Sequence, residues 1–154
     1  MDIKLTIDKL EDERRSEEHR LCLSKDINSA KIDKYDRLIA YYFTLYTNTL
    51  SDISEKKESV DFYEGIIAFK EMISSPKILE RISVISDKHL LERISYLEEK
   101  IDSLISKSDY LRKRTMKYKE KKIKLEDENA RYMDEIGIVD ENIKRYRLVR
   151  KKAR

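Results

Sequence analysis

The residues best suited to metal or acid–base chemistry lie in an N-terminal charged cluster and at two histidines. The segment EDERRSEEHR (residues 11–20) contains several carboxylates and His19, which are groups that bind metal ions. The arginines between those carboxylates favour instead a solvated helix whose opposite charges pair three and four residues apart. His89, the second histidine, is distant in sequence and also lies among charged residues. We therefore expect no metal site and no catalytic site.

The single thiol, Cys22, lies between Leu21 and Leu23. One cysteine excludes an internal disulfide and any site made of several cysteines. Its apolar neighbours favour a small core residue over a reactive nucleophile. The chain has two glycines, Gly65 and Gly137, so it lacks a glycine-rich phosphate-binding loop. We expect a non-enzymatic protein with no cofactor and no small-molecule substrate.

Two basic segments are candidates for a nucleic-acid contact. They are RKRTMKYKEKK (residues 112–122) and the tail KRYRLVRKKAR (residues 144–154), which has seven basic residues and no acidic one. Basic side chains neutralise phosphates, and the interleaved Tyr118 and Tyr146 could stack on bases. Both tyrosines also fall on the apolar heptad described below, so core packing explains them better than base stacking. The candidate contacts in the tail are Lys144, Arg145, Arg147, Arg150, Lys151, Lys152 and Arg154.

The composition indicates long helices with few turns. Charged residues make up 42% of the chain and hydrophobic residues 40%, with only two glycines and one proline to form turns. Net charge is +3, from 34 basic and 31 acidic residues, which does not single out a nucleic-acid partner. The sequence has no apolar run approaching the roughly 18 residues of a membrane span, and no secretion signal. We expect an all-α, intracellular protein without a membrane contact.

A heptad pattern begins at Leu90 and continues to Tyr146 in unbroken steps of four and three residues, over about eight repeats. Isoleucine recurs at the first core position of the repeat and leucine at the fourth, a combination that favours two parallel strands. The pattern predicts an extended coiled coil in which this seam is buried. The predicted coiled-coil interface comprises Leu90, Ile94, Leu97, Ile101, Leu104, Leu111, Leu125, Ile136, Val139 and Ile143.

The middle of this seam is polar. Four successive first-core positions hold Ser108, Thr115, Lys122 and Asn129. Each of these polar side chains contributes less burial free energy than isoleucine would at the same position, by about 1 kcal/mol or more. A parallel homodimer would place two Lys122 side chains together, whereas an acidic or polar residue opposite would relieve that charge. The layer therefore favours a heteromeric coil, with a locally loosened homodimer as the alternative.

A second series in steps of three and four runs upstream, from Ile32 to Lys70. Beside it lies another apolar stripe, so this face is wider than a two-stranded coil requires. It could hold a third helix, such as an amphipathic N-terminal piece around Leu10 and Leu21, or the helices of a partner. The stripe consists of Phe62, Ile66, Phe69 and Ile73.

The only proline, Pro76, follows Ser75, and the pair predicts a hinge. A serine N-cap followed by proline is typical of a helix start, and proline disfavours a continuing helix before it. One helix is therefore expected to end near Ile73 and another to begin near Pro76, with a further slip in register at residues 86–88. Both a kinked rod and a tight reversal fit, and the isoleucine/leucine bias leans toward the rod. The predicted segments are 1–26 (charged N-terminal piece), 27–75 (helical arm) and 76–154 (long arm with a basic tail).

The stretch FYEGIIAFKEMISSP (residues 62–76) resembles the Tyr-x-x-Leu-Ala-x-x-Ile-x-x-x-Pro segment of the THO complex subunit 7 family. A leucine coil containing LEEKIDSL and the basic run LRKRTMKYKEKK follow it, as in that family, so the resemblance covers about residues 50–125. It implies a nuclear, non-catalytic subunit that pairs through its coil with another THO subunit, in a complex coupling transcription to mRNA packaging and export. The matching positions are Tyr63, Ile66, Ile67, Ile73 and Pro76.

Three functions are thus expected from the sequence. The first is a coiled-coil scaffold subunit that pairs with another coiled-coil protein, favoured as a heteromer, in nuclear mRNA biogenesis. The second is a nucleic-acid-binding helical protein that uses the basic tail. The third is a homodimeric structural coiled coil of the kinetochore, spindle or tether type.

Overall fold

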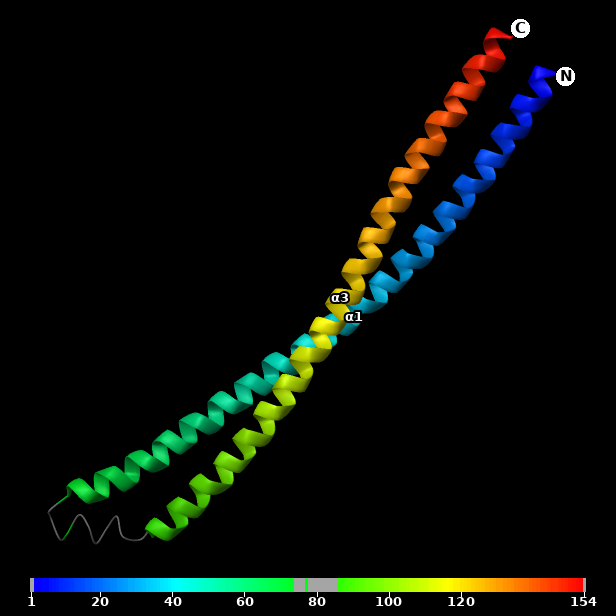
Figure 1. Cartoon of the computed structure of the whole chain (residues 1–154). Helices are drawn as coiled ribbons and strands as arrows, with labels where there is room; N and C mark the ends of the chain where they lie inside the picture. Colours follow the sequence, from blue (N-terminus) through cyan, green and yellow to red (C-terminus); the bar gives the residue numbers. More distant parts are fainter. Residues whose placement is uncertain (1, 74–76, 78–85, 154) are drawn as a thin grey trace. The chain divides into compact units, whose positions relative to one another are not determined.

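The computed structural model describes residues 2–73, 77 and 86–153. Two long helices account for most of these residues: α1, Ile3–Met72, and α3, Asp87–Lys152 (Figure 1). The all-α prediction is confirmed, and α1 ends one residue before the predicted end at Ile73. The predicted hinge residues, Ser75 and Pro76, lie outside the described residues, as does the expected helix start near Pro76.

Side-chain caps fix where each helix begins. The Asp2 carboxylate accepts a hydrogen bond from the Lys4 backbone N–H (3.0 Å), and the Ser86 hydroxyl accepts one from the His89 backbone N–H (3.2 Å). Such caps satisfy backbone donors that have no partner within the first turn. α3 therefore begins within residues 86–88, whereas the segment before it, from which the slip in register is predicted, lies outside the described residues.

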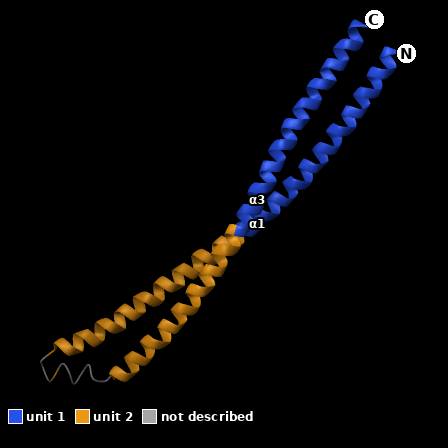
Figure 2. Cartoon of the chain, viewed as in Figure 1, with its two compact units in different colours: residues 1–39, 117–154 blue, residues 40–116 orange. Residues whose placement is uncertain are grey.

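The chain divides into two compact units (Figure 2). Unit 1 consists of residues 1–39 and 117–154, and unit 2 of residues 40–116. Each unit therefore combines a stretch of α1 with a stretch of α3. The predicted boundary between segments 1–26 and 27–75 falls inside α1, which is continuous there, so the N-terminal piece is not a separate third helix.

The core of unit 2 joins the predicted seam of α3 to the upstream series of α1. Near one end of the unit, the Lys70 ammonium lies 3.2 Å from the Asp87 carboxylate, which pairs the last turns of α1 with the first turn of α3. The two helices of unit 2 therefore run antiparallel. The buried cluster is formed by Ile53 and Val60 of α1 with Ile94, Leu97 and Ile101 of α3.

Unit 1 is built in the same way. Leu21 of α1 is buried against Val139 and Ile143 of α3. The Asn129 amide nitrogen donates to the Ser29 hydroxyl (3.3 Å), a contact between residues 100 positions apart. The helices of unit 1 are also antiparallel, and both chain termini lie at the same end of this unit (Figure 1).

Every residue of the predicted interface and of the polar layer is buried or half-buried in α3. The preference for a parallel arrangement, which the isoleucine/leucine bias suggested, is wrong within each unit. A heptad pattern specifies which positions are buried, whereas the chain that covers them depends on where the helix reverses. Here α1 of the same chain covers the seam of α3.

The seam of α1 extends further toward the N-terminus than the sequence indicated. The steps of three and four that begin at Ile32 continue upstream without a break as far as Ile7, at positions that are all buried or half-buried. Most of these positions carry polar or charged side chains, which hid the pattern. The upstream seam positions are Ile7, Glu11, Arg14, Glu18, Leu21, Lys25 and Asn28.

Candidate protein-interaction surfaces

The polar layer of α3 finds its partners inside the chain. The Lys122 ammonium lies 2.6 Å from the Asp36 carboxylate of α1 and 3.5 Å from that of Glu126. The hydrogen bond to Asp36 raises the pKa of Lys122, although partial desolvation opposes the rise. The acidic residue expected opposite Lys122 is therefore present, and it belongs to the same chain.

The two hydroxyls of the polar layer bond within their own helix. Ser108 donates to the Ile105 carbonyl oxygen (2.8 Å), and Thr115 donates to the Leu111 carbonyl oxygen (2.9 Å). Serine and threonine commonly satisfy their hydroxyls in this way when they face an apolar neighbour helix. These two residues therefore need no second chain.

The tyrosines of the two basic segments pack on the seam. The Tyr118 ring stacks on Tyr35 of α1, with ring centroids 5.8 Å apart, and Tyr146 is half-buried. Core packing, the preferred interpretation of both residues from the sequence, therefore describes their place in unit 1. Base stacking would require them to leave that packing.

Part of the basic tail is paired with α1. The Arg147 guanidinium lies 3.1 Å from a Glu11 carboxylate oxygen, and Arg150 lies 2.7 Å from Asp8 and 3.1 Å from Glu11. The hydrogen bond from Arg147 lowers the pKa of Glu11, although the side chain is only 5% exposed and burial acts the other way. Arg154 lies outside the described residues. The described basic residues of the tail that form no ion pair with α1 are all exposed: Lys144, Arg145, Lys151 and Lys152.

The groups that suggested metal or acid–base chemistry do not converge. His19 lies in unit 1 and His89 in unit 2, both exposed, and Cys22 is half-buried. In the charged cluster, Arg14 pairs with Glu17 (2.7 Å) and Arg15 with Glu11 (2.8 Å), at the predicted helical spacings. Within the described ranges, no group of histidine, cysteine, aspartate and glutamate side chains is placed to hold a metal ion.

The aromatic stripe (Phe62, Ile66, Phe69 and Ile73) lies along one side of the unit 2 seam, because each of its first three members precedes a seam residue by one position. Phe62 is 66% exposed and Phe69 is 55% exposed. The matching positions on α3 are Arg93, Tyr96 and Lys100. Both cations lie over the Tyr96 ring, at 5.3 and 5.5 Å from its centroid. This side of unit 2 is apolar and basic.

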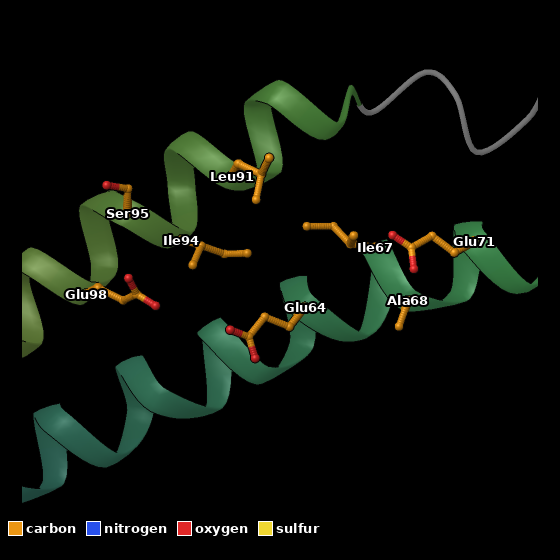
Figure 3. Close-up of a pocket in the computed structure, with 8 residues that line it drawn as sticks. All are labelled: Glu64, Ile67, Ala68, Glu71, Leu91, Ile94, Ser95 and Glu98. Atoms are coloured by element: carbon orange, nitrogen blue, oxygen red, sulfur yellow. The ribbon is translucent and has the colours of Figure 1, made fainter.

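The other side of unit 2 forms a groove with acidic walls (Figure 3). Ile67 and Ile94 point toward each other across its floor, and the cavity volume is about 490 Å³. On each helix, the residues that form its walls come one position after a seam residue, whereas the residues of the aromatic stripe come one position before. The groove and the stripe therefore lie on opposite sides of α1. The acidic groove is lined by Glu64, Ile67, Ala68, Glu71, Leu91, Ile94, Ser95 and Glu98.

Sequence reasoning identified the aromatic stripe but missed the acidic groove. The stripe is continuous along one helix and can be read from residues 62–73 alone. The groove needs residues 64–71 and 91–98 from two helices, and they meet only because the chain reverses between them. The signal available in the sequence was the absence of a basic residue three or four positions from Glu64, Glu71 or Glu98.

Neither helix, over the residues that the structure describes, contains an apolar stretch able to cross a bilayer.

Comparison with known proteins identifies no relative. No family model, curated protein or solved structure matches the chain.

Proposed function

We propose that the chain is a non-catalytic scaffold subunit that binds a helical partner subunit through the aromatic stripe. The observation that supports this proposal is the exposure of Phe62 and Phe69 at a heptad spacing on a long helix. Burying apolar surface contributes about 25 cal/mol of binding free energy per Å². A partner helix can contact such a stripe with apolar residues of its own at similar spacing. Phenylalanine is also enriched in protein–protein interfaces.

The seam itself is not the surface offered to the partner. In each unit it is covered by the other helix of the same chain, and Lys122 already has an acidic neighbour. The stripe is an exposed apolar surface that lies beside the seam in unit 2. Arg93 and Lys100 of α3 border that side, so the partner helix is expected to carry acidic residues around its apolar contacts.

The resemblance to the THO complex subunit 7 family supplies the cellular context of the proposal. Among its matching positions, Ile66 and Ile73 belong to the aromatic stripe, and Tyr63 and Ile67 belong to the adjacent seam. The proposed partner is therefore another coiled-coil subunit of a THO-like complex. The proposed process is the coupling of transcription to mRNA packaging and export in the nucleus.

The test is co-expression of the chain with the coiled-coil subunits of a THO complex, followed by co-purification. The double variant Phe62→Ser/Phe69→Ser is expected to retain the helicity of the wild type. The amount of partner that co-purifies with it should fall at least tenfold. Two aromatic residues of the same helix and unit, Tyr41 and Phe43, provide the matched control, since they are 59% and 51% exposed. Tyr41→Ser/Phe43→Ser should bind as the wild type does. Equal binding by both double variants, or no binding of any THO subunit, would refute the proposal.

A second candidate function, nucleic-acid binding by the tail, is favoured by the exposure of Lys144, Arg145, Lys151 and Lys152. Affinity for a single-stranded RNA, measured by fluorescence anisotropy, should then fall steeply between 50 and 200 mM salt. Substituting glutamine for those four residues should weaken binding and flatten the salt dependence. An affinity that changes neither with salt nor with these substitutions would rule out this candidate function.

A further inference from the structure

We propose that the acidic groove of unit 2 binds the C-terminal segment of α3 (residues 144–151) from a second copy of this chain. The floor of the groove is apolar: Ile94 is 7% exposed, Ile67 is half-buried, and Leu91 at its edge is 58% exposed. Figure 3 shows these side chains directed into the space between the helices, with Glu64 and Glu98 beside them. The groove therefore offers an apolar contact bordered by negative charge.

Over the residues that the structure describes, the negative charge of the groove has no basic partner. Over the described residues, no ion pair involves Glu64, Glu71 or Glu98. No basic residue lies three or four positions from any of the three, so intrahelical pairing is not available. Three carboxylates around an apolar floor are complementary to a helix with basic residues on both sides of an apolar one.

The C-terminal segment of α3 has that composition. Lys144, Arg147, Leu148 and Lys151 line a shallow hollow of about 390 Å³. Leu148 is 58% exposed, although it lies at the centre of this surface. Within the described part of the chain, Lys144 and Lys151 take part in no ion pair, whereas Arg147 is held by Glu11. Two lysines and a leucine are therefore available to a partner.

The spacings on the two surfaces agree. Glu64 and Glu71 are seven residues apart, as are Lys144 and Lys151, and two helical turns place both pairs about 10.5 Å apart. A small residue, Ala68, lies four positions after the first glutamate, and Leu148 lies four positions after the first lysine. A parallel pair of helices can therefore form both charge pairs while Leu148 fills the space above Ala68. The match involves charge, size and register together.

This inference does not rest on the proposed partner subunit. The groove and the aromatic stripe lie on opposite sides of the unit 2 seam, so each can be altered without the other. Because every copy carries both a groove and a C-terminal segment, the contact is heterologous and can be repeated from one copy to the next. Charge pairing at the rim makes it sensitive to salt.

The test is sedimentation velocity of the full chain at 50 mM and 500 mM salt over a range of concentrations. We expect the mass to rise with concentration at low salt and to fall toward the monomer at high salt. Glu64→Lys/Glu71→Lys should weaken self-association at least tenfold, and Lys144→Glu/Lys151→Glu should do the same. Mixing these two variants pairs a basic groove with an acidic segment, and this mixture should associate again.

The control variant, Asp52→Lys/Glu55→Lys, makes the same change in net charge on the opposite side of α1, at two exposed positions of unit 2. It should associate as the wild type does, and circular dichroism should show equal helicity for all variants. A wild-type chain that remains monomeric at low salt would overturn the proposal. So would groove variants that associate normally, or a mixture of the two charge-reversed variants that fails to associate.

Discussion

The Lys122 ammonium of α3 lies 2.6 Å from the Asp36 carboxylate of α1, within the polar layer of the α3 seam. The two residues belong to the same unit, so this pair reports directly which chain covers the polar layer. A lysine at a core position normally indicates a specific partner residue opposite it. In this protein that residue is supplied by the preceding helix of the same chain.

The first prediction concerns this ion pair. Lys122→Gln and Asp36→Asn each remove one charge while keeping a polar side chain, and each should lower the melting temperature by about 1–3 °C, because each breaks the ion pair that joins the two helices. The double variant should lose less than the sum of the single variants, which is the signature of a direct interaction. Thermal unfolding followed by circular dichroism provides the measurement. Strictly additive losses would mean that the two residues do not interact in solution.

The second prediction compares the same substitution, isoleucine to alanine, at a seam position and at an exposed position of α3. Ile101 is 8% exposed in the unit 2 core, and Ile105, one turn later on α3, is 45% exposed. Ile101→Ala should cost about 2–4 kcal/mol of unfolding free energy, and Ile105→Ala less than about 1 kcal/mol, because only the first leaves a cavity. Urea denaturation of both variants measures the difference. Equal losses would show that the seam lies elsewhere.

The seam of α3 could be predicted from the sequence because its period requires only the apolar residues themselves. Ile94, Leu97 and Ile101 repeat at heptad spacing, and all three are buried where the pattern placed them. The identity of the covering helix could not be predicted in the same way. The preference of isoleucine and leucine for particular core positions is calibrated on parallel dimers, so it misled when the chain folded back on itself.

The first turns of the α1 seam escaped prediction for a different reason. Glu11, Arg14, Glu18 and Asn28 occupy core positions there, and a pattern search for apolar residues passes over them. Glu11 is tolerated at 4% exposure because basic residues from both helices surround its carboxylate. Such compensation depends on residues more than a hundred positions away, which no local pattern contains.

The third prediction follows from Glu11. Arg147, which donates to the carboxylate, lowers the pKa of Glu11 below its ordinary value, so the folded state favours the ionised form. The resulting stability is fully present at pH 7 and is lost as the pH falls below about 4.3, the ordinary range of glutamate. Glu11→Gln should therefore melt at a lower temperature than the wild type at pH 7. The gap should narrow as the pH falls below about 4.3, and a gap that is constant with pH would contradict the role assigned to ionisation.

The fourth prediction has the opposite sign and concerns Glu18. Asp140 of α3, which lies beside Glu18, raises its pKa, and burial acts in the same direction. The folded state therefore prefers the protonated acid, and at pH 7 the two carboxylates destabilise unit 1. Glu18→Gln should raise the melting temperature by about 1–3 °C at pH 7, and the gain should shrink as the pH falls toward 4. A loss of stability at pH 7 would show that Glu18 is needed in its ionised form.

The most direct test of the account asks whether the two helices of unit 1 meet within a single chain. With Cys22→Ser as the background, Ser29→Cys and Asn129→Cys place thiols where a 3.3 Å hydrogen bond now joins the side chains. The control pairs Ser29→Cys with Arg131→Cys, which lies at nearly the same height on α3 but on its exposed face. Mild oxidation followed by mass analysis under denaturing conditions is expected to give a cross-linked monomer for the 29/129 pair and little cross-linking for the control. A cross-linked dimer, or no preference for position 129 over position 131, would contradict an antiparallel seam closed within one chain.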